Sequence, residues 1–253
     1  RGRSHEGLFN VTDHEVAHNW FPMLVNNDER MHAWMDEGFT TFINHYSLEA
    51  FYGEKEHAPD VSKYDATKFV NQRVPMNTPP DLLESRGHLS YRKPGYGLRL
   101  LREEIIGAER FDAAFVEYVH RWAFKSPRPA DFYRTMEDAS GVDLQWFFKG
   151  FFEESLQLDQ AITSVNQEQK KQEWKVIVSL ANKADWVCPV DLQILCVDGS
   201  EHRYKLPVTI WAWSDEHRQS FSLPSPATSV RIDPDDAYPD IDRSNNDVFN
   251  IRQ

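Results

Sequence analysis

The stretch His14-Glu15-Val16-Ala17-His18 has the pattern H-E-x-x-H near the start of the chain. On an α-helix, side chains four positions apart share one face, with Cβ atoms roughly 5–6 Å apart. His14 and His18 can therefore both reach one Zn²⁺ at about 2.0–2.1 Å. The side chain of Glu15 leaves the helix about 100° from His14, so we expect it to hold a water molecule beside the metal rather than the metal.

A third metal ligand is expected downstream, because a catalytic zinc site usually has three protein ligands and one open position. Glu37 follows His18 after eighteen intervening residues, within Trp34-Met35-Asp36-Glu37-Gly38-Phe39-Thr40. The pattern H-E-x-x-H-(x18)-E, with its W-x-[ND]-E-G-[FL] box, resembles the gluzincin metallopeptidases, specifically the aminopeptidase N and leukotriene-hydrolase family. The resemblance implies one Zn²⁺ per chain, bound by His14, His18 and Glu37.

Simpler interpretations of these residues compete with the zinc site. Thr12 and Glu15 have the S/T-x-x-E spacing of a capping box, which would make Glu15 a helix-start residue. The two histidines could also be ordinary surface residues. H-E-x-x-H alone arises by chance in roughly a few per cent of chains of this size. Glu37 at the family spacing favours the zinc site over these alternatives.

The composition limits the class of protein. A chain of 253 residues suits one large domain or two ordinary ones, and 40% hydrophobic residues with eight Trp and sixteen Phe suffice for well-packed cores. The net charge of −12 argues against nucleic acid or an anionic membrane surface as the main partner. The sequence has no run of eighteen apolar residues, so we expect no membrane span.

The two cysteines, Cys188 and Cys196, fall in one extended-looking stretch. If that stretch is a single strand, they lie about 26 Å apart and cannot form a disulfide. We expect both to be buried small apolar residues, which leaves the cellular compartment open. The family resemblance is compatible with a bacterial periplasmic or secreted protein and leaves a cytoplasmic location open. The sequence does not indicate an oligomeric state.

Helical periodicity dominates the first part of the chain. A first helix is expected over residues 4–21, ended by Pro22. A second is expected over 36–51, with Glu37 in its first turn and Gly53 after its end. Further helices are predicted at residues 63–73, 91–106, 111–123, 130–139 and 143–152. The last of them carries an aromatic stripe that we interpret as core packing rather than a ligand site: Trp146, Phe147, Phe148, Phe151 and Phe152.

The hydrophobic period changes from helical to alternating in the last third of the chain. Strands are predicted at 174–180 and 190–196, then after the hairpin signal Asp198-Gly199 at 204–213, 221–223 and 229–232. Several short strands separated by turns predict a small antiparallel β-sandwich over about residues 161–253, with an irregular tail at 239–246. With the resemblance, the expected fold is a mostly α-helical, thermolysin-like catalytic subdomain at 1–157 followed by a β-sandwich domain at 158–253.

The segment Tyr91-Arg92-Lys93-Pro94 resembles the family's Y-x-K-[GP] box, whose tyrosine hydroxyl donates to the oxyanion formed during hydrolysis. The resemblance implies this role for Tyr91, with Tyr96 as a nearby rival, although most tyrosines only pack. It also implies that Glu15 acts as the general base. The family often has an outer-shell carboxylate seven positions after Glu37. That position is Asn44 here, which would raise the basicity of a ligand histidine less.

The resemblance implies a zinc aminopeptidase acting on a peptide substrate. The family's G-x-M-E-N motif, which helps to bind the substrate amine, lies upstream of the zinc helix, as does an N-terminal β-domain. This chain begins about a dozen residues before His14. We therefore expect a missing N-terminal part of a parent chain, and little aminopeptidase activity from these 253 residues alone. Alternatives are a metallo-endopeptidase or other zinc hydrolase on the same scaffold, and a zinc-retaining non-catalytic binding module, against which Glu15 and Tyr91 argue.

Overall fold

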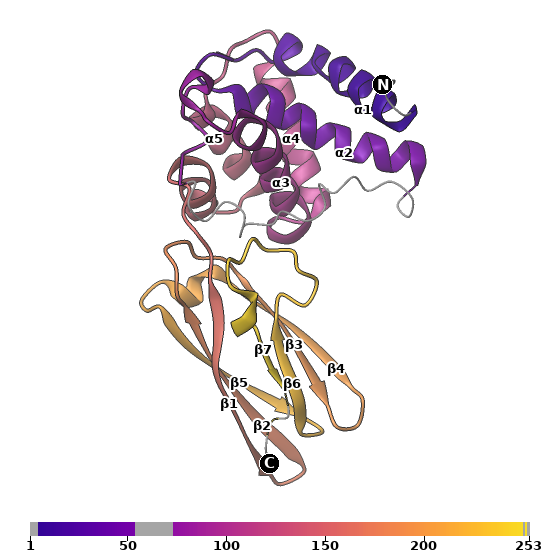
Figure 1. Cartoon of the computed structure of the whole chain (residues 1–253). Helices are drawn as coiled ribbons and strands as arrows, with labels where there is room; N and C mark the ends of the chain where they lie inside the picture. Colours follow the sequence, from indigo (N-terminus) through magenta and orange to yellow (C-terminus); the bar gives the residue numbers. More distant parts are fainter. Residues whose placement is uncertain (1–4, 54–72, 250, 252–253) are drawn as a thin grey trace. The chain divides into compact units, whose positions relative to one another are not determined.

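The computed structural model of the protein describes residues 5–53, 73–249 and 251. These residues divide into two compact units (Figure 1). The helical unit comprises 5–53 and 74–155, and the β unit contains residue 73 and the described residues from 156 onward. The domain boundary between 157 and 158 stays a prediction, and the helix predicted at 63–73 lies outside the described residues except for Arg73. No described helix is both long enough and apolar enough to cross a membrane.

The helical unit consists of α-helices joined by short π-helical turns. Its α-helices are α1 (His5–Ala17), α2 (Phe39–Tyr52), α3 (Lys93–Leu100), α4 (Ala108–Trp122), α5 (Pro129–Ser140) and α6 (Gln145–Phe147). Its other turns are η1 (Asn19–Leu24), η2 (Trp34–Gly38), the 3₁₀ turn η4 (Pro80–Leu82), η5 (Gly87–Arg92), η6 (Leu101–Ile105) and η7 (Phe148–Glu153). The mostly helical fold predicted for this region is confirmed.

The predicted helix ends differ from the structure where π-helical turns and proline intervene. α1 ends at Ala17, so the predicted end at residue 21 is wrong. The backbone is non-helical at both Phe21 and Pro22. A proline removes a backbone donor and also disfavours the helical conformation of the residue before it, so the interruption reaches back into the preceding turn. The helical segment expected at 91–106 begins four residues earlier, at Gly87.

Aromatic residues form the core of the helical unit. Phe39 has ring centroids of Phe21 and Phe132 4.9 Å away, and Trp34 has that of Phe152 at the same distance. The stripe predicted to pack in the core does so, with Trp146 half-buried and the other members buried: Phe147, Phe148, Phe151 and Phe152. Trp34 and Phe39 flank Glu37 in sequence, so the core holds the segment that carries the expected third metal ligand.

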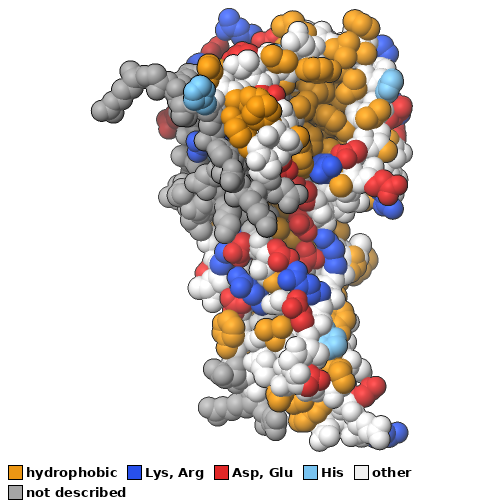
Figure 2. All heavy atoms as spheres, turned by 90° about the vertical axis from the view of Figure 1, so that its right-hand side faces the viewer, with side chains coloured by type: hydrophobic (Ala, Val, Ile, Leu, Met, Phe, Trp, Pro, Cys, Tyr) orange, Lys and Arg blue, Asp and Glu red, His pale blue; other side chains and the backbone are white. Residues whose placement is uncertain are grey.

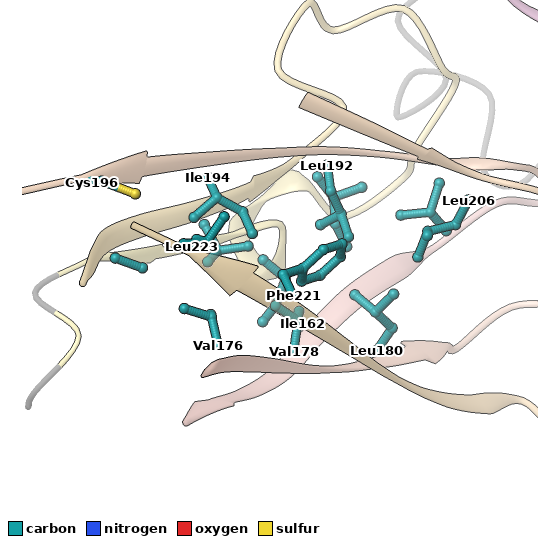
Figure 3. Packing of buried hydrophobic residues seen from close by; sticks show 14 of the residues in the cluster. Ile162, Val176, Val178, Leu180, Leu192, Ile194, Cys196, Leu206, Phe221 and Leu223 are labelled. Carbon is teal, nitrogen blue, oxygen red and sulfur yellow. The ribbon is translucent and has the colours of Figure 1, made fainter. Parts of the chain in front are cut away.

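The β unit is a sandwich of two antiparallel sheets. Its strands are β1 (Gln160–Lys170), β2 (Glu173–Asn182), β3 (Val190–Cys196), β4 (Glu201–Leu206), β5 (Glu216–Leu223), β6 (Ala227–Ile232) and β7 (Asp247–Phe249). The sheet orders are β1-β2-β5 and β4-β3-β6-β7. Alternate residues from both sheets point into one apolar core, where Val178 and Phe221 of one sheet meet Ile194 and Leu192 of the other (Figure 3). The predicted β-sandwich is confirmed.

Several details of the sandwich correct the sequence-based prediction. The strand expected over 204–213 ends at Leu206, because Pro207 cannot donate to the ladder and a 3₁₀ turn, Val208–Trp211, follows. β1 and the short β7 were not predicted. The β3–β4 hairpin turns at Gly199, with φ of +83°, as the Asp-Gly signal indicated. Both cysteines are free and buried, as expected, with Cys188 just before β3 and Cys196 at its end.

Side chains of different kinds gather on the two units (Figure 2). On the face shown, hydrophobic side chains are concentrated over the helical unit, whose exposed apolar residues include Leu8, Met23 and Phe51. Acidic and basic side chains are interspersed over the sandwich, where Arg203 contacts both Glu201 and Asp235. On this face the larger hydrophobic patches lie over the helical unit, and smaller ones lie over the sandwich.

Candidate metal centre

The structure brings the three sequence-predicted metal ligands together. His14 lies on α1, His18 in the turn that follows α1, and Glu37 in η2. Oε2 of Glu37 is 3.1 Å from Nε2 of His14 and 3.6 Å from Nε2 of His18. One ligand atom from each of the three residues lies within 4.8 Å of the others. The two imidazole rings meet edge to face, with centroids 4.9 Å apart. The three side chains thus converge on one point between α1 and η2.

This arrangement fits a zinc ion. Four ligands at about 2.0–2.1 Å in a tetrahedron place neighbouring ligand atoms about 3.3 Å apart. The separations of Glu37 Oε2 from the two Nε2 atoms, 3.1 and 3.6 Å, lie on either side of that value. Two imidazole nitrogens and one carboxylate oxygen are a common catalytic zinc donor set. The side chains of the three residues are about one-fifth exposed, which leaves one side of the site accessible.

His18 is oriented through its other ring nitrogen. Nδ1 lies 2.9 Å from the carbonyl oxygen of Phe21 and 2.8 Å from Oδ1 of Asp36. Two acceptors beside Nδ1 place the proton on that nitrogen, which leaves Nε2 unprotonated and available to a metal. Burial lowers the pKa of His18, but the Phe21 carbonyl and the carboxylates of Asp36 and Glu37 outweigh it and raise the pKa above its ordinary value.

Asp36 is a site residue that sequence reasoning missed. It entered the sequence analysis only as the variable [ND] position of the Trp34–Thr40 box. In the structure its side chain is buried, with the residue 7% exposed, and it contacts the imidazole of His18. Burial and the neighbouring charge of Glu37 raise the pKa of Asp36 well above its ordinary value. The signal that could have identified it is a second carboxylate directly before the third ligand.

Tyr91 reaches the site from η5. Its hydroxyl donates to Oε1 of Glu37 at 2.5 Å, and its ring stacks on that of His14 at a centroid distance of 5.8 Å. Burial and the Glu37 carboxylate raise the pKa of Tyr91, so the phenol keeps its proton. Burial would raise the pKa of Glu37, but its contacts with His14 and Tyr91 lower it. The rival, Tyr96, is buried beside Phe151 instead.

Gly38 permits the close packing that brings Tyr91 to Glu37. A Cβ atom at position 38 would lie 2.6 Å from Cβ and 2.7 Å from Cγ of Pro94, the second residue of α3. A proline ring cannot rotate away from such an overlap, so a larger residue would push η2 away from α3. The glycine of the Trp34–Thr40 box is therefore explained by contact between two elements of the site.

Glu15 and Asn44 complete the set of sequence-predicted site residues. Glu15 is exposed on α1, next to the first ligand His14. Asn44 lies on α2 but does not support a ligand histidine: among the described residues no hydrogen bond joins it to His14 or His18. Its amide instead donates to Oδ2 of Asp13 at 2.5 Å. The outer-shell contact considered for Asn44 is therefore not made, and the buried carboxylate beside a ligand histidine is Asp36.

Comparison with known proteins places this site in a family. The model of the "Peptidase family M1 domain" matches residues 2–151. The chain belongs to peptidase family M1. The resemblance inferred from the motifs is thus confirmed, and the metallopeptidase class fits this family. The roles of the individual site residues stay predictions.

Relatives within family M1 are aminopeptidases by name. The rice protein aminopeptidase M1-A is 26% identical over 194 residues, covering 72% of this chain and 22% of the relative. Aminopeptidase M1 of Arabidopsis thaliana is 24% identical over 225 residues, covering 85% of this chain and 23% of the relative. The crystal structure of Legionella pneumophila aminopeptidase A in complex with aspartic acid has the same fold, with a TM-score of 0.61 at 17% identity over 92% of this chain and 26% of that one. The chain thus spans about a quarter of the length of each of these proteins.

Proposed function

We propose that the protein is a zinc-dependent aminopeptidase that removes N-terminal residues from peptides. Membership of family M1 supports peptide hydrolysis as the reaction class. The observation that carries the finer proposal is the convergence of the nitrogens of His14 and His18 with Oε2 of Glu37 at separations that suit tetrahedral zinc. The names of the M1 relatives support removal of N-terminal residues rather than internal cleavage.

Zinc held by these three residues would act as a Lewis acid toward the peptide carbonyl and lower the pKa of a water molecule. Glu15, exposed beside His14, accepts the proton of that water as general base and passes it to the leaving amine. The hydroxyl of Tyr91 donates to the negative charge that develops on the carbonyl oxygen. Its raised pKa supports this role, because a protonated phenol can donate a hydrogen bond.

The contact between Tyr91 and Glu37 also supports separate roles for the two carboxylate oxygens of Glu37. Tyr91 donates to Oε1 of Glu37, while Oε2 faces the two histidines. One carboxylate oxygen is therefore engaged by the phenol and the other is directed to the metal position. The closeness of the Tyr91 hydroxyl to the ligand set supports its proposed contact with a substrate oxygen.

The proposal is tested by separating the base from the ligands in the complete protein. Glu15→Gln should lower kcat by about 10²–10⁴-fold while zinc stays bound, because it removes the proton acceptor and no ligand. His14→Ala combined with His18→Ala should abolish zinc binding. Glu117→Gln, an exposed glutamate on α4, serves as the matched control and should keep full activity. Near wild-type kcat in Glu15→Gln would reject the assigned base.

The position of cleavage is tested with paired substrates. An aminopeptidase should hydrolyse a peptide with a free N-terminal amine and not its N-acetylated form, because acetylation removes the charge that the substrate site must recognise. The measurement is kcat/KM for both substrates with the complete protein. Equal values would assign an endopeptidase on this scaffold, while retained zinc without hydrolysis of either would assign a binding module.

A further inference from the structure

Helices α1 and α2 lie side by side in antiparallel directions, and their contacts form three successive layers (Figure 1). In the outer layer Phe9 stacks on Phe51, with ring centroids 4.2 Å apart. In the innermost layer His18 approaches Thr40, with Nδ1 and Oγ1 3.4 Å apart. The middle layer, Asp13 with its α2 partners, is polar. Asp13 directly precedes the first histidine, His14, in the sequence.

Asp13 accepts hydrogen bonds from two side chains of α2. Oδ2 of Asp13 receives the amide of Asn44 at 2.5 Å, and Oδ1 receives the hydroxyl of Ser47 at 2.6 Å. Asn44 is buried, and its amide nitrogen also lies 3.5 Å from the carbonyl oxygen of Asn10. Both neighbours of that nitrogen are acceptors, which fixes the orientation of the amide group. Each carboxylate oxygen of Asp13 is therefore engaged by a different residue of the facing helix.

These contacts join the element that carries the histidines to the element that follows Glu37. Asp13 is adjacent to His14, and Asn44 lies seven residues, or about two helical turns, beyond Glu37. Hydrogen bonds to an ionised carboxylate are shorter and stronger than neutral ones, so this layer resists separation or sliding of α1 against α2 more than an apolar contact would. A shift of one helix along the other would change the separation of Glu37 from both histidines.

We propose that Asp13 is a positioning residue that sets the spacing of the zinc ligands by clamping α1 to α2 through Asn44 and Ser47. This inference rests on the proposed zinc site. Asp13 acts through the two helices and contacts neither the metal position nor the substrate. The carboxylate that the sequence lacks at position 44 is thus provided from the opposite helix, where it holds the helix pair rather than a histidine.

The test uses zinc affinity of the complete protein, measured by competition with a chromogenic chelator. Asp13→Asn removes the negative charge that strengthens both hydrogen bonds, even where its new amide nitrogen turns to donate to Ser47, and should raise the Kd for zinc about tenfold. Asn44→Asp sets a second carboxylate against Asp13 and should raise it by a similar factor. Ser47→Ala removes one of the two bonds and should have a smaller effect, about threefold. Far-UV circular dichroism verifies that each variant is folded.

The combined variant Asp13→Asn with Asn44→Asp exchanges donor and acceptor across the layer. The introduced amide can donate to the introduced carboxylate, and its oxygen can still accept from Ser47. This variant should regain zinc affinity to within about threefold of wild type. The visible absorption spectrum of the cobalt-substituted protein should differ from wild type in each single variant and return in the combined one. A role limited to general stability would leave that spectrum unchanged.

Phe51→Ala is the matched control, because it removes an α1–α2 contact in the outer layer. It should change the Kd for zinc by less than about threefold. Wild-type affinity in both Asp13→Asn and Asn44→Asp would overturn the role of Asp13. Failure of the combined variant to recover, or an equal loss in Phe51→Ala, would also overturn it. A wild-type protein that does not bind zinc would instead reject the proposed function on which the inference depends.

Discussion

Asp233 of the sandwich and Asp36 of the helical unit are both buried, but their surroundings differ. In the sandwich, Asp233 is 3% exposed and accepts backbone N–H groups of Ala237 and Tyr238 at 2.8 and 2.9 Å. The guanidinium of Arg243 adds a contact at 2.9 Å. This carboxylate is thus surrounded by donors and by a positive charge, as is usual for a buried ion.

Asp36 of the helical unit is buried almost as fully but less well compensated. It contacts the imidazole of His18 at 2.8 Å, and the next residue in the chain, Glu37, carries a charge of the same sign. Burial and that neighbouring charge are what raise the pKa of Asp36. Two carboxylates close together in a half-buried site favour the binding of a cation. The comparison teaches that the well-compensated carboxylate of Asp233 supports the fold of the sandwich, whereas the poorly compensated carboxylate of Asp36 lies at the candidate metal centre.

The largest expected effect follows from supplying the cation. Zinc at a thousand times its Kd should raise the unfolding free energy of the helical unit by about 4 kcal/mol, since it binds only the folded state. The sandwich, which contains none of the three predicted ligands, should not respond. Hydrogen exchange with and without zinc locates the gain. The double variant His14→Ala with His18→Ala is the control and should show no gain. An equal zinc-dependent increase in protection of both units would contradict the expected difference between them.

The second largest effect is expected from removing the carboxylate of Asp233, which should lower the unfolding free energy. Asp233→Ala leaves the backbone N–H groups of Ala237 and Tyr238 without their acceptor and Arg243 with one carboxylate fewer, so we expect a loss of about 3 kcal/mol in unfolding free energy. Chemical denaturation measures it, with Asp235→Ala, an exposed aspartate that pairs with Arg203, as the control. Zinc affinity should stay unchanged in Asp233→Ala. A coupled loss of zinc would show that the sandwich charges also serve the metal centre.

Lys93 tests whether every poorly compensated charge belongs to the metal centre. Burial lowers the pKa of Lys93 to about 7, and its ammonium donates to the hydroxyl of Ser155 at 2.6 Å. Between pH 7 and 10.5 the unfolded chain binds a proton that the folded chain lacks, so wild-type stability should rise with pH by about 1.4 kcal/mol per unit.

Lys93→Met should remove that slope and stabilise the protein at pH 7. The gain should be on the order of 2 kcal/mol, because leaving Ser155 unpaired offsets part of the desolvation relieved. Denaturant midpoints measured at pH 7 and pH 10 provide the test. Lys149→Met, at an exposed position of η7, should keep the wild-type dependence of stability on pH, because Lys93 is still present. A constant difference between Lys93→Met and wild type at both pH values would show that the lysine is not buried as described.

The smallest expected effect is that of Asp36→Asn. Loss of the carboxylate beside His18 should weaken zinc binding about tenfold, at the lower end of the range for a group that supports a metal ligand. Without zinc, stability should hold or rise slightly, because the like charge beside Glu37 is removed. Asp138→Asn, on the exposed face of α5, is the control. A destabilised metal-free protein would place Asp36 with Asp233 as a compensated structural charge.

Local patterns predicted much of the fold and the ligand set. The spacing of His14 and His18, followed by Glu37 in its box, indicated three ligands that the structure brings within 4.8 Å of one another. Alternation predicted the central strands of the sandwich, since one face of each is buried. These features depend on helix and strand periods, which a sequence displays directly.

Features that depend on partners from distant segments could not be predicted in this way. Asp36 gave no sign that it would face His18, and Asp13 gave none that it would meet Asn44, because both contacts arise from packing between elements. β1 was missed since its outer half, with residues such as Asn166, Gln167 and Glu168, is polar and lacks clear alternation. The strand predicted at 204–213 ends at Leu206, because Pro207 cannot donate to the sheet and the chain continues as a 3₁₀ turn.

The contact between Gly38 and Pro94 has a consequence for recombination between related enzymes. The two positions are far apart in sequence, yet the missing Cβ of one makes room for the rigid ring of the other. A chimera that took the ligand-bearing segment from one parent and the tyrosine-bearing segment from another would combine surfaces shaped for different partners. Crossover points that keep positions 38 and 94 from the same parent should therefore yield more functional hybrids than crossovers placed between them.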